Sequence, residues 1–412
     1  MIPNPALGVV FHWLGGLASA SFYVPYRWVR VWSWETFWLA GGIFSWLIAP
    51  WFVAWLNTHD LFAVLRATPD VTLFWVASCG LLWGVGGLTY GLTMRYLGLS
   101  LGMAVVLGLC AAFGTLMPPL LHGVFATQVL GTLSGRIILM GVFVCLVGIT
   151  VAGLAGVSKE RVMSPEQRKT VIQEFNLRKG IAVAILSGIM SGFFAIGLDQ
   201  GNTISKLALE HGTPPLWQGL AILPVLLVGG FVTNFIWCVI LHVRNRSGGE
   251  YFRRWTRNGA AVRRETTVET AIDAPSREVV EHSSGRQEDA GGGSAVLAAQ
   301  IPAVEPHQMK YAARRVPMLA NYLLCAVAGT CWYFQFFFYT MGESQMGRYK
   351  FSSWTLHMAS IIIFGSLWGI GFKEWKGAGW RAWCLLTLAL LLLVGSTVIV
   401  GYGNYLAAGL VH

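Results

Sequence analysis

Ten apolar stretches, each of about 20 residues, run along the whole chain and constrain its fold more than any other feature. An α-helix of that length crosses the roughly 30 Å hydrocarbon core of a membrane. The stretches are continuously apolar and lack the alternation of an outer-membrane strand, so they predict helices. The sequence therefore predicts an all-α polytopic membrane protein with ten transmembrane helices. These lie approximately at residues 5–24, 35–56, 71–92, 98–121, 136–156, 180–203, 216–241, 317–341, 353–372 and 382–403.

The composition agrees with a membrane protein. Of the residues, 55% are hydrophobic and 12% are charged, about half the charged share of an ordinary soluble domain. No Lys or Arg precedes the first stretch, so we expect it to remain in the mature protein instead of acting as a secretory signal. All seven cysteines lie inside predicted spans without metal-ligand spacing, and we interpret them as small core residues. We expect no metal ion and no cofactor.

Positive charge is concentrated in the connections that follow odd-numbered stretches. These connections hold 24 of the 29 Lys and Arg residues, and the even-numbered ones hold 5. By the positive-inside rule the odd connections are cytoplasmic, which places both termini outside. The net charge of +10 then reflects membrane orientation, and we expect no nucleic-acid partner.

Two self-matches suggest that the chain contains one unit twice. Residues 8–22 match residues 180–194 at five of fifteen positions, and FGTL at 113–116 corresponds to FGSL at 364–367. Each half would hold five spans, an odd number, so the two five-helix repeats would be inverted, with a site near the midplane between them. The predicted boundaries are 1–156 for the first repeat, 157–179 for a cytoplasmic linker, 180–241 with 316–403 for the second repeat, and 404–412 for a C-terminal tail.

Residues 242–315 break the apolar pattern. They are rich in Arg, Glu, Ser, Gly and Ala, and we interpret them as a disordered cytoplasmic insertion. Its basic start, Arg244 to Arg264, would lie on anionic lipid headgroups. The alternative is an inert linker.

Six short motifs, spread in order along the predicted helices and their ends, resemble the L-rhamnose/proton symporter family of the drug/metabolite transporter superfamily. They are WSWET at 32–36, YGLTMRYLG at 90–98, EFNL at 174–177, QFFFY at 335–339, LHM at 356–358 and KEW at 373–375. The resemblance implies uptake of a neutral 6-deoxyhexose, most simply L-rhamnose, with protons as coupling ion through the cytoplasmic (inner) membrane. It also implies the ten-helix fold of that superfamily. The insertion and Asp199 depart from the family pattern.

A sugar site inside a membrane needs polar side chains at depth, which are costly there unless they are used. At 1.5 Å per residue, His12 lies about 10 Å and His357 about 6 Å from the outer ends of their spans. Gln335 lies in the outer third of its span and Asp199 near the outer end of its own. We expect these four residues to line an outward-facing vestibule. The alternative is that each makes a separate helix-to-helix hydrogen bond or meets interfacial water.

Aromatic faces would cover the apolar side of a sugar ring. Tyr90, Tyr339 and Trp354 are the candidates for this role, although most of the 19 Trp, 12 Tyr and 23 Phe must be core or interfacial residues. For the proton we favour His12 and His357, because histidine titrates near neutral pH. Asp199 and Glu35 are the competing proton carriers.

A second polar set lies at the predicted cytoplasmic level. It contains Arg27, Glu35, Tyr90, Arg95 and Glu374. Glu35 and Arg95 would pair as an inner gate. The alternative is that Glu35 stabilises a helix start behind Ser33 and that Arg95 is an ordinary positive-inside anchor.

The sequence has less support for functions other than sugar symport. The chain contains GLSLG at 98–102, which matches G-x-S-x-G, but a hydrolase elbow needs a strand before the serine, and this segment lies between two predicted helices. We therefore expect no enzyme. Within the transporter class, a carrier of another sugar, a polyol or an exported metabolite stays open, and so does a sensor that binds without transport.

Overall fold

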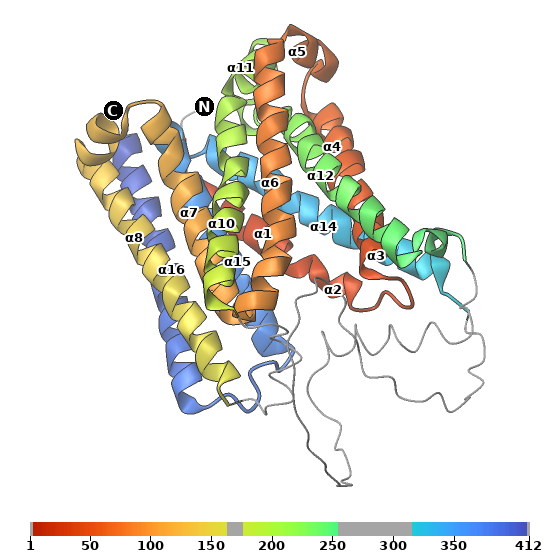
Figure 1. Ribbon diagram of the computed structural model, residues 1–412. Coiled ribbons are helices and arrows are strands. Elements are labelled where there is room, and N and C mark those ends of the chain that lie inside the picture. Colours follow the sequence, from red (N-terminus) through yellow and green to blue (C-terminus); the bar gives the residue numbers. More distant parts are fainter. Residues whose placement is uncertain (1–2, 163–175, 254–314, 410–412) are drawn as a thin grey trace, which may run out of the picture.

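The computed structural model describes residues 3–162, 176–253 and 315–409. Within these ranges it is all-helical, and ten helical segments are long and apolar enough to cross a membrane, which confirms the predicted spans. The helices stand side by side as one bundle (Figure 1). Both ends of the chain lie at the same end of this bundle, which we call the terminal end (Figure 1).

The first half of the chain forms five spans and three short connecting helices. The second span is interrupted by a π-helical turn, η1, just before Pro50, whose ring cannot supply the amide hydrogen that a regular helix needs. The elements are α1 (Pro5–Ser21), α2 (Tyr23–Tyr26), α3 (Trp34–Gly42), η1 (Ile43–Ile48), α4 (Ala49–Asn57), α5 (Leu61–Ala67), α6 (Asp70–Leu97), α7 (Leu99–Leu121), η2 (Phe125–Leu130) and α8 (Leu133–Glu160).

The second half forms the other five spans. Its elements are α10 (Leu177–Gln200), α11 (Asn202–Glu210), η3 (Pro215–Trp217), α12 (Ile222–Asn245), η4 (Gly248–Tyr251), α14 (Met318–Ser344), η5 (Gly347–Ser352), α15 (Ser353–Gly371) and α16 (Trp380–Gly409). Several helices continue past the predicted ends: α6 reaches Leu97 and α14 reaches Ser344. The apolar signal stops where a helix leaves the hydrocarbon, whereas the backbone hydrogen bonds continue beyond that level.

Each half of the chain packs against the other. α1 lies against α14 and α15, and α10 lies against α6 and α7. α8 and α16 run along each other, as Figure 1 shows, and α12 packs on α6. A site between these helices is therefore built from both halves.

Contacts at two glycines agree with the two self-matches of the sequence. A Cβ atom at Gly16 would meet the side chain of Ser360, and one at Gly188 would meet Leu109. Gly188 aligns with Gly16 in the first self-match, and Leu109 aligns with Ser360 when the second is extended without gaps. These equivalent contacts support a repeated unit, and the inverted relation between the halves stays a prediction.

The expected insertion begins later than the sequence suggested. α12 continues to Asn245, η4 follows, and Glu250 is buried, so residues 242–253 belong to the folded bundle. Their polar side chains form specific hydrogen bonds, which composition alone does not reveal. The rest of the expected insertion, including the basic residues from Arg254 to Arg264, lies outside the described residues, and so do residues 163–175 of the expected linker.

Two further expectations need correction. The tail expected at 404–412 is helical as far as Gly409, because α16 extends beyond its apolar core. Five cysteines are buried as expected, but Cys331 is half-buried and Cys384 is exposed. Both lie on membrane-spanning helices, where an exposed apolar side chain can face lipid.

Candidate functional site

Two histidines from different halves of the chain meet near the terminal end of the bundle. His12 of α1 and His357 of α15 both contact the ring of Tyr339 on α14, with ring centroids 5.2 Å and 5.3 Å apart. The imidazoles of His12 and His357 are 0% and 1% exposed. We call these three residues the histidine cluster. The structure thus brings together side chains that lie more than 300 positions apart in the sequence.

Glycines allow the helices to approach closely enough to form this cluster. A Cβ atom at Gly342 would stand 2.8 Å from Cε1 and Nε2 of His12. One at Gly15 would stand 2.9 Å from the carbonyl oxygen of Gln335 and 3.4 Å from Nδ1 of His357. The distances of 2.8 Å and 2.9 Å are shorter than ordinary packing allows, so small residues at these positions let the helices that carry the imidazoles approach each other.

The ring nitrogens of both imidazoles are buried. Neither ring nitrogen of His12 nor of His357 makes a hydrogen bond within the described part of the chain. Gln335, two turns before Glu343 on α14, is also buried and donates one hydrogen bond to the carbonyl of Trp332. Buried polar atoms are normally satisfied in native proteins. Four orphaned nitrogens in one place are therefore suited to the hydroxyl groups of a bound substrate.

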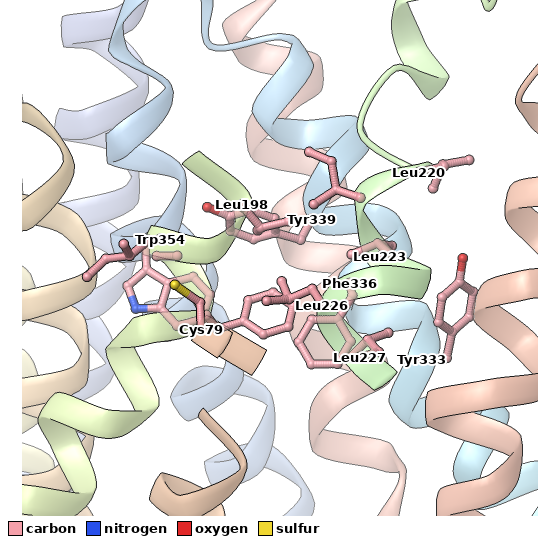
Figure 2. Packing of buried hydrophobic residues seen from close by; sticks show 14 of the residues in the cluster. Cys79, Leu198, Leu220, Leu223, Leu226, Leu227, Tyr333, Phe336, Tyr339 and Trp354 are labelled. Carbon is pink, nitrogen blue, oxygen red and sulfur yellow. The ribbon is translucent and has the colours of Figure 1, made fainter. Parts of the chain in front are cut away.

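Aromatic rings on three helices, α10, α14 and α15, continue from the histidine cluster. Trp354 lies 5.6 Å from Tyr339 and is fixed by a 3.0 Å hydrogen bond from its indole nitrogen to the carbonyl of Cys110. Phe194 stacks on Trp354 at 5.7 Å and on Phe336 at 4.3 Å. We call Trp354, Phe194 and Phe336 the aromatic shelf. Figure 2 shows Trp354, Phe336 and Tyr339 in one packed interior.

The candidate vestibule residues are close together, but they are closed off from solvent in this conformation. His12, Gln335 and His357 are buried, so they do not line an open vestibule here. Asp199, with 18% of its side chain exposed, lies at the rim, where Oδ2 is 2.7 Å from Nε2 of His122. Helix depth predicted that these residues share one level of the bundle, whereas access depends on how neighbouring helices pack.

One acidic residue near this site was missed from the sequence. Glu343 is the last residue but one of α14 and is half-buried. It acts electrostatically on Tyr339, as does Asp199. The predicted span ended at 341, so Glu343 counted as a loop residue. The signal that would have found it is helical spacing, since Gln335, Tyr339 and Glu343 recur every four residues on one face.

Tyr90 does not belong to this site. Its ring packs with Leu97, Val106 and Ala184 between α6, α7 and α10, toward the opposite end of the bundle. Tyr90 was expected to contact the sugar, but α6 runs away from the terminal end and Tyr90 lies near its last turns. Residues with the same chemistry therefore fall at different levels.

The expected gate pair of Glu35 and Arg95 is not found. The Glu35 carboxylate instead accepts hydrogen bonds from Asn245, the last residue of α12, at 3.1 Å and from Ser247, just before η4. Arg27, from the same predicted set, lies 4.0 Å from Glu374. The sequence placed these groups at one level but could not choose the partners among them.

A second acid, Glu250 of η4, stabilises the start of α3. Its Oε2 accepts hydrogen bonds from the backbone N–H of Ser33 at 2.7 Å and from the hydroxyls of Ser33 and Thr36 at 2.8 Å each. Next to it, the Tyr251 hydroxyl is 2.9 Å from Nε2 of His242. Burial raises the pKa of the Tyr251 phenol, so it stays neutral at physiological pH. We call Glu35, Glu250 and their partners the polar latch; it joins α3 to α12 at the end opposite the terminal end.

The G-x-S-x-G segment is a structural turn. Gly98 ends α6 with a φ of 80°, a backbone conformation that favours glycine, and α7 begins directly after it. The backbone N–H and hydroxyl of Ser100 both donate to Oε1 of Glu160, at 3.1 Å and 2.7 Å. Among the described residues, no group of three or more His, Cys, Asp or Glu side chains could hold a metal ion.

Comparisons with known proteins agree with the resemblance seen in the motifs. The sequence model of the L-rhamnose-proton symport protein (RhaT) family matches residues 1–248 and 304–407. The L-rhamnose-proton symporter of Cronobacter sakazakii (strain ATCC BAA-894) is 34% identical over 400 residues, which cover 96% of this chain and 97% of that protein. The L-rhamnose-proton symporters of Yersinia pestis (strain Pestoides F) and Yersinia pseudotuberculosis serotype O:1b (strain IP 31758) are 32% identical over 398 residues, with the same coverage.

Proposed function

Because this chain belongs to the L-rhamnose-proton symport protein family over nearly its whole length, we propose that it carries L-rhamnose into the cell together with protons. The family is one of transporters, so the sequence-based prediction of a carrier and not an enzyme is confirmed. Transport leaves the sugar chemically unchanged, and the proton gradient drives its accumulation. The chain itself must bind the sugar, close around it and couple this closure to a proton.

The observation that carries the proposal for the site is the pair of buried, unpartnered imidazoles. A ring nitrogen of neutral histidine either donates or accepts a hydrogen bond, so His12 and His357 together offer both kinds of partner to sugar hydroxyls. Gln335, which adjoins Gly15 as His357 does, adds a buried amide. We assign these three residues to sugar binding.

The aromatic shelf supplies the apolar half of the same site. A 6-deoxyhexose carries a methyl group in place of the hydroxymethyl group of an ordinary hexose. The flat faces of Trp354 in the shelf and of Tyr339 beside it suit its C–H groups and methyl. A sugar with a hydroxyl at this position would leave that group without a partner at the shelf. A buried hydroxyl without a hydrogen-bond partner strongly weakens binding, so the site would discriminate between otherwise similar sugars.

The membrane orientation is also part of the proposal. We place the terminal end outside, because the connections at the opposite end carry most of the Lys and Arg residues. The site would then lie nearer the outer face of the cytoplasmic membrane. In the described conformation α1 packs closely against α14 at the terminal end, next to the site.

Uptake of labelled L-rhamnose into vesicles tests this function. Protein-containing vesicles with an acidic exterior should accumulate the sugar above its external concentration, and a protonophore should abolish the accumulation. L-Fucose, L-mannose and D-glucose are competitors that differ in ring stereochemistry or in the methyl group. Accumulation of none of these sugars under a pH gradient would refute the proposed function.

A further inference from the structure

Glu343 lies where a proton from the terminal end could influence the sugar site. It is one turn beyond Tyr339 on the same face of α14, and Tyr339 contacts both buried histidines. The residue before it, Gly342, packs directly on the unpartnered imidazole of His12. A change at Glu343 therefore adjoins the binding site without belonging to the sugar-binding surface itself.

A second carboxylate faces the same place from another helix. Asp199, at the end of α10, acts electrostatically on both Glu343 and Tyr339. Lys350 of η5 is the positive group that acts on Glu343. The half-buried end of the site is therefore surrounded by two acids, one lysine, His122, which directly follows α7, and His12 of α1.

The two acids differ in their partners. Asp199 is held by His122 at 2.7 Å and by the Asn202 side chain at 3.2 Å. The Glu343 carboxylate makes no hydrogen bond or ion pair with any other described residue. Two nearby carboxylates repel each other when both are ionised, and a single proton relieves this repulsion. Because Asp199 already has partners, Glu343 is the better position for that proton.

The histidines are less suited to carry the proton. The titratable group that acts on His12 is another histidine, His357, which cannot compensate a positive charge there. Both rings are buried, and an uncompensated buried charge is strongly unfavourable. The sequence favoured His12 and His357 because they were expected in a partly hydrated cavity, and their burial removes that condition.

We propose that Glu343 binds and releases the transported proton, with Asp199 as the fixed charge that makes this protonation sensitive to external pH. This inference rests on the proposed function. Proton binding turns the Glu343 carboxylate into a neutral carboxylic acid, and release regenerates the carboxylate; no covalent bond to the sugar forms. With Glu343 ionised, the two negative charges repel each other and need water, which opposes closure of the terminal end. With Glu343 neutral, that end closes over the bound sugar, and the carrier is free to open on the other side.

Two transport assays separate proton coupling from sugar binding. Accumulation under a pH gradient requires the proton, whereas exchange of labelled for unlabelled L-rhamnose at equal pH does not. A gradient of about one pH unit supports about tenfold accumulation per coupled proton. Glu343→Gln mimics the protonated acid and should reduce the accumulation ratio to about one while exchange continues. Glu210→Gln, an exposed acid on α11 at the same end, should leave both assays unchanged.

Further variants test the role of the acid pair by its pH dependence. Glu343→Asp keeps a carboxylate and should retain accumulation. Asp199→Asn removes the repelling charge, so half-maximal uptake should move to a more acidic external pH. If Glu343→Gln does not reach the membrane, Glu343→Asp and Asp199→Asn still test the proposal.

The outcomes distinguish this inference from the proposed function. If wild-type protein accumulates no sugar, the function fails. If wild type and Glu343→Gln accumulate sugar equally, the assignment of the proton to Glu343 is overturned. Loss of exchange in Glu343→Gln would also overturn it, because Glu343 would then be needed for binding. His357→Gln should weaken exchange and accumulation together; selective loss of accumulation would return the proton to the histidine.

Discussion

Removing the Glu250 side chain should destabilise the bundle, although most of the segment after it should be dispensable. Glu250 is the member of the polar latch that accepts three hydrogen bonds at the start of α3. Composition placed Glu250 in a disordered insertion without buried contacts. On that interpretation, deletion of residues 248–306 should leave transport nearly intact. The structure predicts the opposite for that deletion, because it removes Glu250.

The expected magnitude follows from those three bonds. Hydrogen bonds to a charged group contribute about 1.5–3 kcal/mol each. The three share one oxygen atom and water can replace part of them, so we expect Glu250→Ala to cost about 3–5 kcal/mol, less than their sum. At roughly 2 °C per kcal/mol for a chain larger than a small domain, the apparent melting temperature should fall by about 6–10 °C.

Thermal aggregation of purified protein, followed by size-exclusion chromatography, measures this change. Unfolding of such a protein is usually irreversible, so variants must be compared at one heating rate. Deletion of residues 257–306, which leaves Glu250 in place, is the matched control and should keep the wild-type midpoint. Thr36→Val should lower the midpoint less than Glu250→Ala does. The double variant should lower it by less than the sum of the two single shifts. Equal midpoints for Glu250→Ala and wild type would refute this account of the latch.

Three other predictions concern the site and its orientation. Gly342→Ala should displace the His12 imidazole and raise the half-saturating L-rhamnose concentration about tenfold, which equals about 1.4 kcal/mol of binding free energy. Gly365→Ala is the control and should transport normally, because the space around its Cβ position is open. Gln335→Ala should also weaken sugar binding; an unchanged half-saturating concentration in uptake assays would remove it from the site. A periplasm-active reporter fused after His412 should be active and a cytoplasm-only fluorescent reporter dark, and the reverse pattern would invert the assigned orientation.

Membrane architecture was accessible from the sequence because hydrocarbon imposes a length and a composition on each span. The ten apolar stretches predicted ten helices, and the motifs at their ends led to the right family. Helix depth is also encoded locally, since each residue advances a helix by about 1.5 Å. His12, Gln335 and His357 could therefore be assigned to one level before any contact was known.

Partners, burial and exact helix ends required the tertiary structure. Glu35 had several polar groups at its level, and only the packing of α3 against α12 selects Asn245 and Ser247 over Arg95. Tyr90 and Tyr339 are chemically alike, yet only Tyr339 lies between the two histidines. Depth follows from position along one helix, whereas contact and access depend on how helices from both halves are rotated and packed against each other.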